Sequence, residues 1–88
     1  MKPKKDRKRM QNWLLEELQR SNLKQSELSD LVGIHKNLIS RYCLGYNYPN
    51  IPHFVFICSV LAKAQNKTID EVILRSLRDI VRGDLWNS

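Results

Sequence analysis

Apolar residues recur along most of the chain at the three- and four-residue spacing of amphipathic helices, and strand-like alternation is nearly absent. The pattern predicts five helices with short connections, over 6–21, 25–32, 36–44, 51–65 and about 68–82. A chain of 88 residues is long enough for one small domain. The predicted fold class is therefore all-α.

Residues that start or stop helices lie between these apolar segments. Gly33 supplies the left-handed backbone conformation that ends a helix tightly, and Gly45 closes the next helix. Asn50 can cap the fourth helix. A capping box at 68–71 opens the fifth helix, which we expect to stop at Gly83.

The same spacing predicts which side of each helix faces the core. The fourth helix is apolar over so wide an arc that we expect it to be the central and most buried element. The inward residues of the first two helices are predicted to be Met10, Trp13, Leu14 and Leu18, and Leu28, Leu31 and Val32.

The second and third predicted helices are joined by a tight glycine turn, which is the arrangement of a helix-turn-helix. Ser29 is small, as it must be where two such helices cross closely. The apolar positions that brace the pair are also filled, by Leu28, Val32, Ile34, Ile39 and Tyr42.

The outward face of the third helix then carries side chains that suit base edges in the DNA major groove. Lysine and arginine donate to guanine, asparagine pairs with adenine, and serine donates or accepts. No acidic residue lies within 35–48. An ordinary solvated helix face is the alternative, and it leaves the helix-turn-helix register unexplained. The candidate base-reading residues are Lys36, Asn37, Ser40 and Arg41.

These segments resemble one known family. Residues 23–34, LKQSELSDLVGI, are similar to the second helix and turn of the lambda-repressor-like (Cro/Xre-type) helix-turn-helix regulators of phages and bacteria, usually written L-T-Q-x-E-L-A-x-x-x-G-V. Ile39-Ser40-Arg41 followed by Gly45 resembles the end of the family's third helix, and 49–61 and 68–73 follow its fourth and fifth helices. The resemblance implies a five-helix DNA-binding fold, to which the charge distribution adds a flexible basic N-terminal arm.

The resemblance also implies contacts with the DNA backbone. Gln25 matches the family residue that touches the backbone at the start of the second helix, and the segment after Gly45 matches a backbone-contacting loop. Lys24 stands where the family usually has a Ser or Thr cap, which weakens this helix start but adds a phosphate contact. His35 is expected to cap the third helix or contact phosphate. The candidate backbone-contacting residues are Lys24, Gln25, His35, Tyr46 and Asn47.

The positive charge is concentrated at the N-terminus. The formal charge is +6, and six basic residues with one acidic residue place +5 of it in 1–9. Such an arm indicates a polyanionic partner, most often nucleic acid, although a solvated tail is the alternative. We expect the arm to add affinity for double-stranded DNA with little sequence preference. Its basic residues are Lys2, Lys4, Lys5, Arg7, Lys8 and Arg9.

The fifth predicted helix carries more apolar residues than one core-facing stripe requires. We expect the surplus to form a two-fold homodimer, whose recognition helices meet half-sites of a palindromic operator about one helical turn (~10 bp) apart. The alternatives are that these residues pack on the first helix or hold another protein. The candidate dimer residues are Leu74, Leu77, Val81, Leu85 and Trp86, the last two in a C-terminal tail at 84–88 that follows a domain at 10–83.

The predicted function is a sequence-specific transcriptional regulator, most simply a repressor, of phage, plasmid or bacterial origin. The alternative is a protein-interaction module, such as an antitoxin or a phage or plasmid accessory factor, that uses the fifth helix. RNA binding is less favoured because no stacking aromatic lies among the basic residues of the third helix.

The sequence offers little for other chemistry. No phosphate-binding glycine loop or nucleophile–base set appears, so we expect no enzyme and no cofactor. Cys43, Cys58, His35 and His53 match no zinc-ligand spacing, and we expect two reduced thiols and no metal. With neither a signal peptide nor an apolar run of the ~20 residues that span a membrane, a cytoplasmic location is expected.

Overall fold

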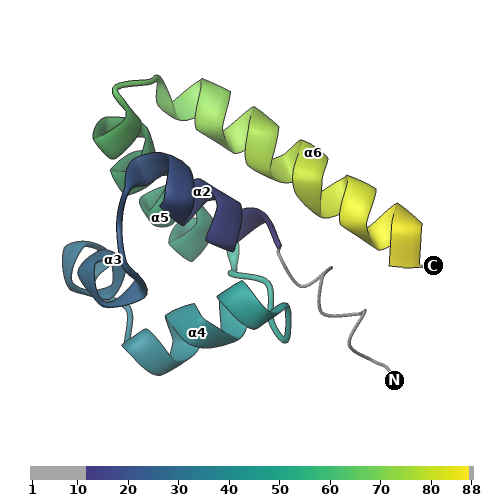
Figure 1. Ribbon diagram of the computed structural model, residues 1–88, viewed down its shortest axis with the longest axis horizontal. Coiled ribbons are helices and arrows are strands. Elements are labelled where there is room, and N and C mark those ends of the chain that lie inside the picture. Colours follow the sequence, from purple (N-terminus) through teal and green to yellow (C-terminus); the bar gives the residue numbers. More distant parts are fainter. Residues whose placement is uncertain (1–11, 88) are drawn as a thin grey trace.

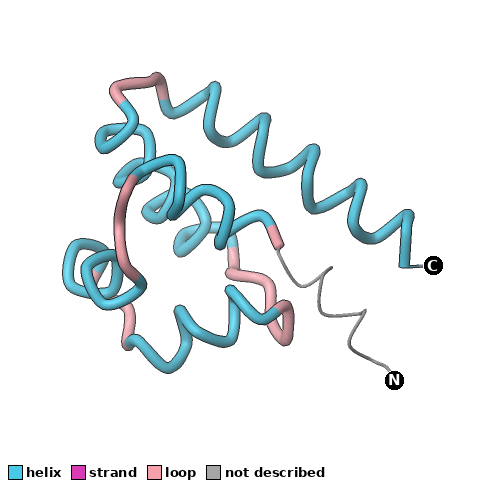
Figure 2. Tube along the Cα trace, in the orientation of Figure 1, coloured by secondary structure: helices cyan, strands magenta, loops and turns pink. Residues whose placement is uncertain are grey.

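The computed structural model describes the backbone of residues 12–87 and the side chains of residues 12–82. The elements are the helices α2 (Trp13–Ser21), α3 (Gln25–Val32), α4 (Lys36–Leu44), α5 (Ile51–Gln65) and α6 (Ile69–Asn87), shown in Figure 1. Short loops connect them, and no strand occurs in this part of the chain (Figure 2). The five-helix, all-α fold predicted from the sequence is confirmed.

The helices are arranged in three layers around one core. α6 lies along one side, α3 and α4 lie on the other, and α2 and α5 lie between them (Figure 1). Trp13 of α2 meets Phe54 of α5 edge-on, with ring centroids 5.4 Å apart, a favourable geometry for an aromatic pair. The buried apolar side chains are Trp13, Leu14, Leu18, Leu28, Ile34, Ile39, Tyr42, Cys43, Ile57, Cys58, Leu61, Ala62 and Val72.

Asparagines define several helix ends. The Asn12 side chain accepts hydrogen bonds from the backbone N–H groups of Leu14 and Leu15, and α2 therefore begins at Trp13. We had placed the start of this helix at Asp6, and residues 6–11, together with Met10 and the basic arm, lie outside the described part. Asn50 caps α5 as predicted, by accepting from the His53 N–H at 2.9 Å.

One prediction about an inward face is wrong, and another holds only in part. Leu31 is 61% exposed, because the core side of α3 passes through Leu28, Ser29 and Val32 instead. α5 packs against α2, α3 and α6, which confirms its central position, yet Val55 and Phe56 are exposed. A helix with neighbours on three sides still leaves one strip open, and apolar residues occupy that strip at the start of α5.

A buried polar cluster joins α2, α5 and α6. Glu17 is fully buried, and its carboxylate accepts from Arg75 Nε at 2.8 Å and Arg75 Nη2 at 2.9 Å. The Gln65 side-chain amide donates to Glu17 and Ser21 and accepts from Arg75. Burial alone raises the pKa of Glu17, but the hydrogen bonds and charge of Arg75, with Gln65 and Arg20, lower it overall.

The last helix is longer than predicted. The capping box forms, since the Thr68 hydroxyl accepts from the Glu71 N–H and the Glu71 carboxylate accepts from the Thr68 N–H. We expected Gly83 to end the helix, but α6 continues to Asn87. A helical glycine costs about 1 kcal/mol relative to alanine, which neighbouring turns can offset. Residues 84–87 are therefore helical and not an irregular tail.

The surplus apolar residues of α6 remain uncovered. Leu74, Leu77 and Val81 are 61%, 44% and 55% exposed, so α2, the described part of the first predicted helix, leaves much of each side chain uncovered. The side chains of Leu85 and Trp86 lie outside the described part. None of the helices described has the length and apolar character needed to cross a membrane.

Candidate nucleic-acid interface

The turn between α3 and α4 is held from both sides. Gly33 adopts φ +73°, a left-handed conformation that suits glycine and redirects the chain directly after α3. The Ser29 hydroxyl donates to the carbonyl of Ile34 at 2.5 Å, which ties α3 to the end of the turn. Leu28, Ile34 and Ile39 are buried beneath it. The predicted helix-turn-helix is therefore present, and Ser29 contributes a hydrogen bond as well as small size.

The outer side of α4 carries the four candidate base-reading residues. Lys36, Asn37 and Arg41 are exposed, and Ser40 is partly exposed. The opposite side, with Ile39, Tyr42 and Cys43, is buried. Leu44 is also exposed and follows Ser40 by one helical turn, so it shares the outer side. Leu44 was not among the predicted surface residues of this helix, although its spacing from Ser40 could have identified it.

His35 caps α4. Its Nδ1 accepts a hydrogen bond from the backbone N–H of Asn37 at 3.1 Å. The first of the two roles expected for His35 is thus present in the structure. The cap fixes the N-terminus of α4 beside the glycine turn, which sets the direction in which the first outer residues project.

The start of α3 lacks a side-chain cap. Lys24 occupies the N-cap position, and an ammonium group cannot accept a hydrogen bond. Half of a capping box remains, since the Glu27 carboxylate accepts from the Lys24 N–H at 2.8 Å. The first backbone N–H groups of α3 thus have no side-chain acceptor at the N-cap, a typical setting for an anion.

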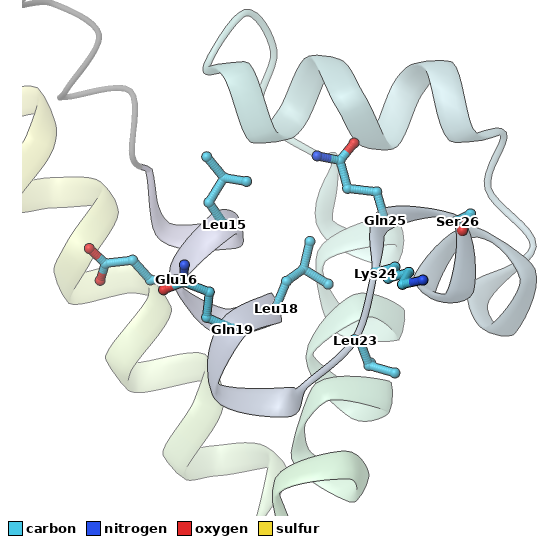
Figure 3. A pocket seen from close by; sticks show the side chains of 8 residues that line it. All are labelled: Leu15, Glu16, Leu18, Gln19, Leu23, Lys24, Gln25 and Ser26. Carbon is cyan, nitrogen blue, oxygen red and sulfur yellow. The ribbon is translucent and has the colours of Figure 1, made fainter.

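A pocket lies between α2 and the start of α3 (Figure 3). Leu15 and Gln25 stand on opposite sides of it. Its lining mixes apolar, amide and oppositely charged groups and brings together no nucleophile and base. The lining residues are Leu15, Glu16, Leu18, Gln19, Leu23, Lys24, Gln25 and Ser26.

Arg41 is held by the loop that follows α4. Its Nε donates to the Asn47 side-chain oxygen at 3.1 Å. Its guanidinium carbon lies 5.6 Å from the centroid of the Tyr46 ring, within the range of a cation–π contact. The two loop residues expected at the DNA backbone therefore contact a candidate base-reading residue.

The inner side of α4 is anchored to α2 and α5. The Asn12 side-chain amide, whose oxygen caps α2, donates to the carbonyl of Tyr42. The Tyr42 hydroxyl and His53 Nδ1 are hydrogen-bonded at 3.0 Å. Burial raises the pKa of Tyr42, so its hydroxyl stays protonated at neutral pH. These contacts hold α4 against the body of the domain.

The two cysteine thiols are buried and do not lie on the outer side of α4. Cys43 and Cys58 form no disulfide. Burial raises the pKa of Cys43 to about 12 and that of Cys58 to about 11, so neither is a thiolate at neutral pH. Within residues 12–82, His, Cys, Asp and Glu side chains form no group of three suited to a metal ion.

Comparison with known proteins adds one result. The helix-turn-helix family model of the lambda-repressor-like type matches residues 14–64, which extend from the second residue of α2 to the last but one of α5 and include the turn described above. The comparisons with curated proteins and with solved structures gave no match. The matched region covers more than half of the chain and contains the braced turn and α4 with its exposed polar side. The chain therefore belongs to the lambda-repressor-like (Cro/Xre-type) family of helix-turn-helix DNA-binding regulators.

Proposed function

We propose that this protein is a repressor that reads its operator in the DNA major groove with α4. The observation that carries the proposal is the outer side of α4, where Lys36, Asn37, Ser40 and Arg41 project from a helix anchored at its N-cap and on its inner side. Arginine or lysine on guanine and asparagine on adenine are the pairings that such a surface supports. Occupancy of an operator that overlaps a promoter excludes polymerase.

The neighbouring helix start supplies backbone contacts in this proposal. The uncapped N–H groups at the start of α3 and the ammonium of Lys24 together favour a phosphate, and Gln25 stands beside them. The basic arm at 2–9 adds phosphate contacts with little sequence preference.

We further propose that two copies assemble through α6. Leu74, Leu77 and Val81 form an exposed apolar stripe, which a second copy would cover.

The DNA-binding proposal is tested by selecting sequences from randomised duplexes and measuring affinity by fluorescence anisotropy at two salt concentrations. We expect the wild type to enrich one motif and to bind it at least ~10³-fold more tightly than an unrelated duplex. The double variant Asn37→Ala/Arg41→Ala should keep only salt-sensitive, non-selective binding. Lys63→Ala, which removes one exposed charge from α5, is the matched control. No enriched motif with the wild type would contradict the proposal.

Sedimentation at micromolar concentration tests the homodimer. We expect the wild type to be a dimer and Leu77→Asp to be a monomer, because a charge in the stripe cannot be buried without a partner. Leu31→Asp places the same change at an exposed leucine of α3 and should remain a dimer. Wild-type monomers both with and without DNA would contradict the homodimer and favour a different protein partner for α6, as in an antitoxin or accessory factor.

A further inference from the structure

We propose that Tyr46 and Asn47 act as positioning residues for Arg41, and that they prepare its guanidinium to read a guanine before DNA is bound. The proposal rests on the proposed function, because it assumes that Arg41 reads a base. It assigns to these two residues a role in sequence discrimination, in place of the backbone contacts implied by the family resemblance.

Two contacts restrict the Arg41 side chain. The Asn47 oxygen accepts from Nε at 3.1 Å, which orients the plane of the guanidinium. The guanidinium carbon lies over the Tyr46 ring, 5.6 Å from its centroid. An arginine normally loses much rotamer freedom when it binds, and prior restriction lowers that cost. Arg41 can therefore meet a base edge with less loss of entropy than an unrestrained arginine.

The backbone turn after α4 creates this arrangement. Gly45 adopts φ +83°, and the Tyr46 N–H then donates to the carbonyl of Arg41 at 3.0 Å. This is a six-to-one bond of the kind that closes a helix C-terminus. It folds the chain back toward the last turn of α4, which places residues 46 and 47 beside the side chain of Arg41, five and six positions earlier in the chain.

The two contacts leave the reading edge of Arg41 unused. Nε donates to Asn47 and the guanidinium carbon lies over the Tyr46 ring. The two terminal nitrogens, which can bind guanine O6 and N7 as a pair, take part in neither contact. Both partners are neutral, and among residues 12–82 no carboxylate forms an ion pair with Arg41. Its charge is thus retained for DNA, and its orientation is set by groups that do not neutralise it.

The decisive measurement is how strongly the protein prefers a duplex with guanine at the Arg41 site over one in which that base pair is substituted. Loss of a phosphate contact and loss of a positioning contact change this preference differently. A phosphate contact contributes to every duplex alike, whereas a positioned arginine favours only the duplex with guanine at its site. The ratio of the dissociation constants for the substituted and the guanine duplex isolates the second effect. The slope of affinity against salt concentration reports the first, at about one unit for each lost phosphate contact.

The experiment uses the full chain and the motif enriched from randomised duplexes. The guanine read by Arg41 is the position at which Arg41→Ala abolishes the preference. We expect Asn47→Ala and Tyr46→Leu to lower the discrimination ratio there by about threefold to tenfold with an unchanged salt slope. Tyr46→Phe keeps the ring face and should keep the ratio. Thermal melting of each variant confirms that it is folded, as expected for exposed positions.

Three outcomes separate the claims. A fall in the ratio for Tyr46→Leu and Asn47→Ala, rescued by Tyr46→Phe, supports the positioning role. Equal weakening on both duplexes, with a smaller salt slope and an unchanged ratio, overturns it and makes the two residues phosphate contacts. A wild type without any base preference overturns the proposed function itself.

Discussion

Two arginines of this domain are fixed by neighbouring side chains, with opposite consequences. Arg75 of α6 donates twice to the buried carboxylate of Glu17 and once to Gln65, so its charge is neutralised inside the molecule. Arg41 of α4 is held by Asn47 and Tyr46, which are neutral and exposed. The first arrangement joins three helices. The second orients a charge that is still available to a polyanion.

The difference lies in the partner, since both side chains are the same residue type. A carboxylate beside a guanidinium satisfies its charge and hydrogen bonds together. An amide oxygen and an aromatic face direct the guanidinium but leave its charge unpaired. No acidic residue lies within 35–48, the segment that contains Arg41. Arg75, in contrast, forms an ion pair with Glu17. The placement of acids thus separates the structural arginine from the candidate reading arginine.

The largest expected effect is at the buried pair. Glu17→Gln removes the charge that Arg75 faces, and we expect the free energy of unfolding to fall by about 2–4 kcal/mol. The lower part of that range applies because the Arg75 side chain is 24% exposed and can be rehydrated. Denaturant unfolding measures the loss. Glu16→Gln is the matched control, because Glu16 is the exposed neighbour in the same helix, and its effect should stay within ~0.5 kcal/mol.

The same pair gives a pH dependence of defined sign. The pKa of Glu17 is lowered from its ordinary value of 4.5, so its contribution to stability is fully present above that value. The contribution is lost as the pH falls through the lowered pKa of the folded state. The stability difference between wild type and Glu17→Gln should therefore shrink below about pH 4.5 in denaturant unfolding. A difference that is constant from pH 6 to pH 3 would contradict this origin.

A smaller effect on stability is expected at Gly45, which forms the turn beside Arg41. A Cβ added there meets no atom within 4 Å, so only the backbone conformation at φ +83° opposes substitution. Gly45→Ala should lower the free energy of unfolding by about 1 kcal/mol, and Gly45→Asn by less, since asparagine tolerates the left-handed region. Thermal unfolding gives the comparison. Equal losses for the two variants would show that the left-handed conformation is not the cause.

The smallest effect is a gain. Lys24→Ser supplies the cap that the start of α3 lacks, and we expect about 0.5–1 kcal/mol of added stability. The same change removes an ammonium proposed to contact phosphate, so the salt slope of DNA binding should fall by about one unit. Ser26→Ala is the control, because Ser26 lies in the first turn of α3 and its truncation removes an exposed side chain without removing a charge. Unchanged stability with Lys24→Ser would mean that solvent already satisfies these N–H groups.

Some helix bounds follow from local sequence rules, and others depend on the rest of the fold. Local rules were sufficient for α3, α4 and α5, whose bounds agree with the predicted 25–32, 36–44 and 51–65. Their ends depend on Gly33, Gly45 and Asn50, which act on neighbouring backbone groups. The end of α6 was missed, because a glycine permits a helix end without requiring one and its helical cost is only about 1 kcal/mol.

The candidate interface divides in the same way. The sequence by itself predicted that Lys36, Asn37, Ser40 and Arg41 of α4 project outward, because periodicity and the helix-turn-helix register are local. Only the tertiary structure decided that Asn47 and Tyr46 hold Arg41 and that Glu17 faces Arg75, 58 positions further along the chain. Such pairs depend on how helices cross and on which way loops fold back. A one-dimensional pattern of apolar and polar residues specifies the faces of helices, and packing in three dimensions specifies which faces meet.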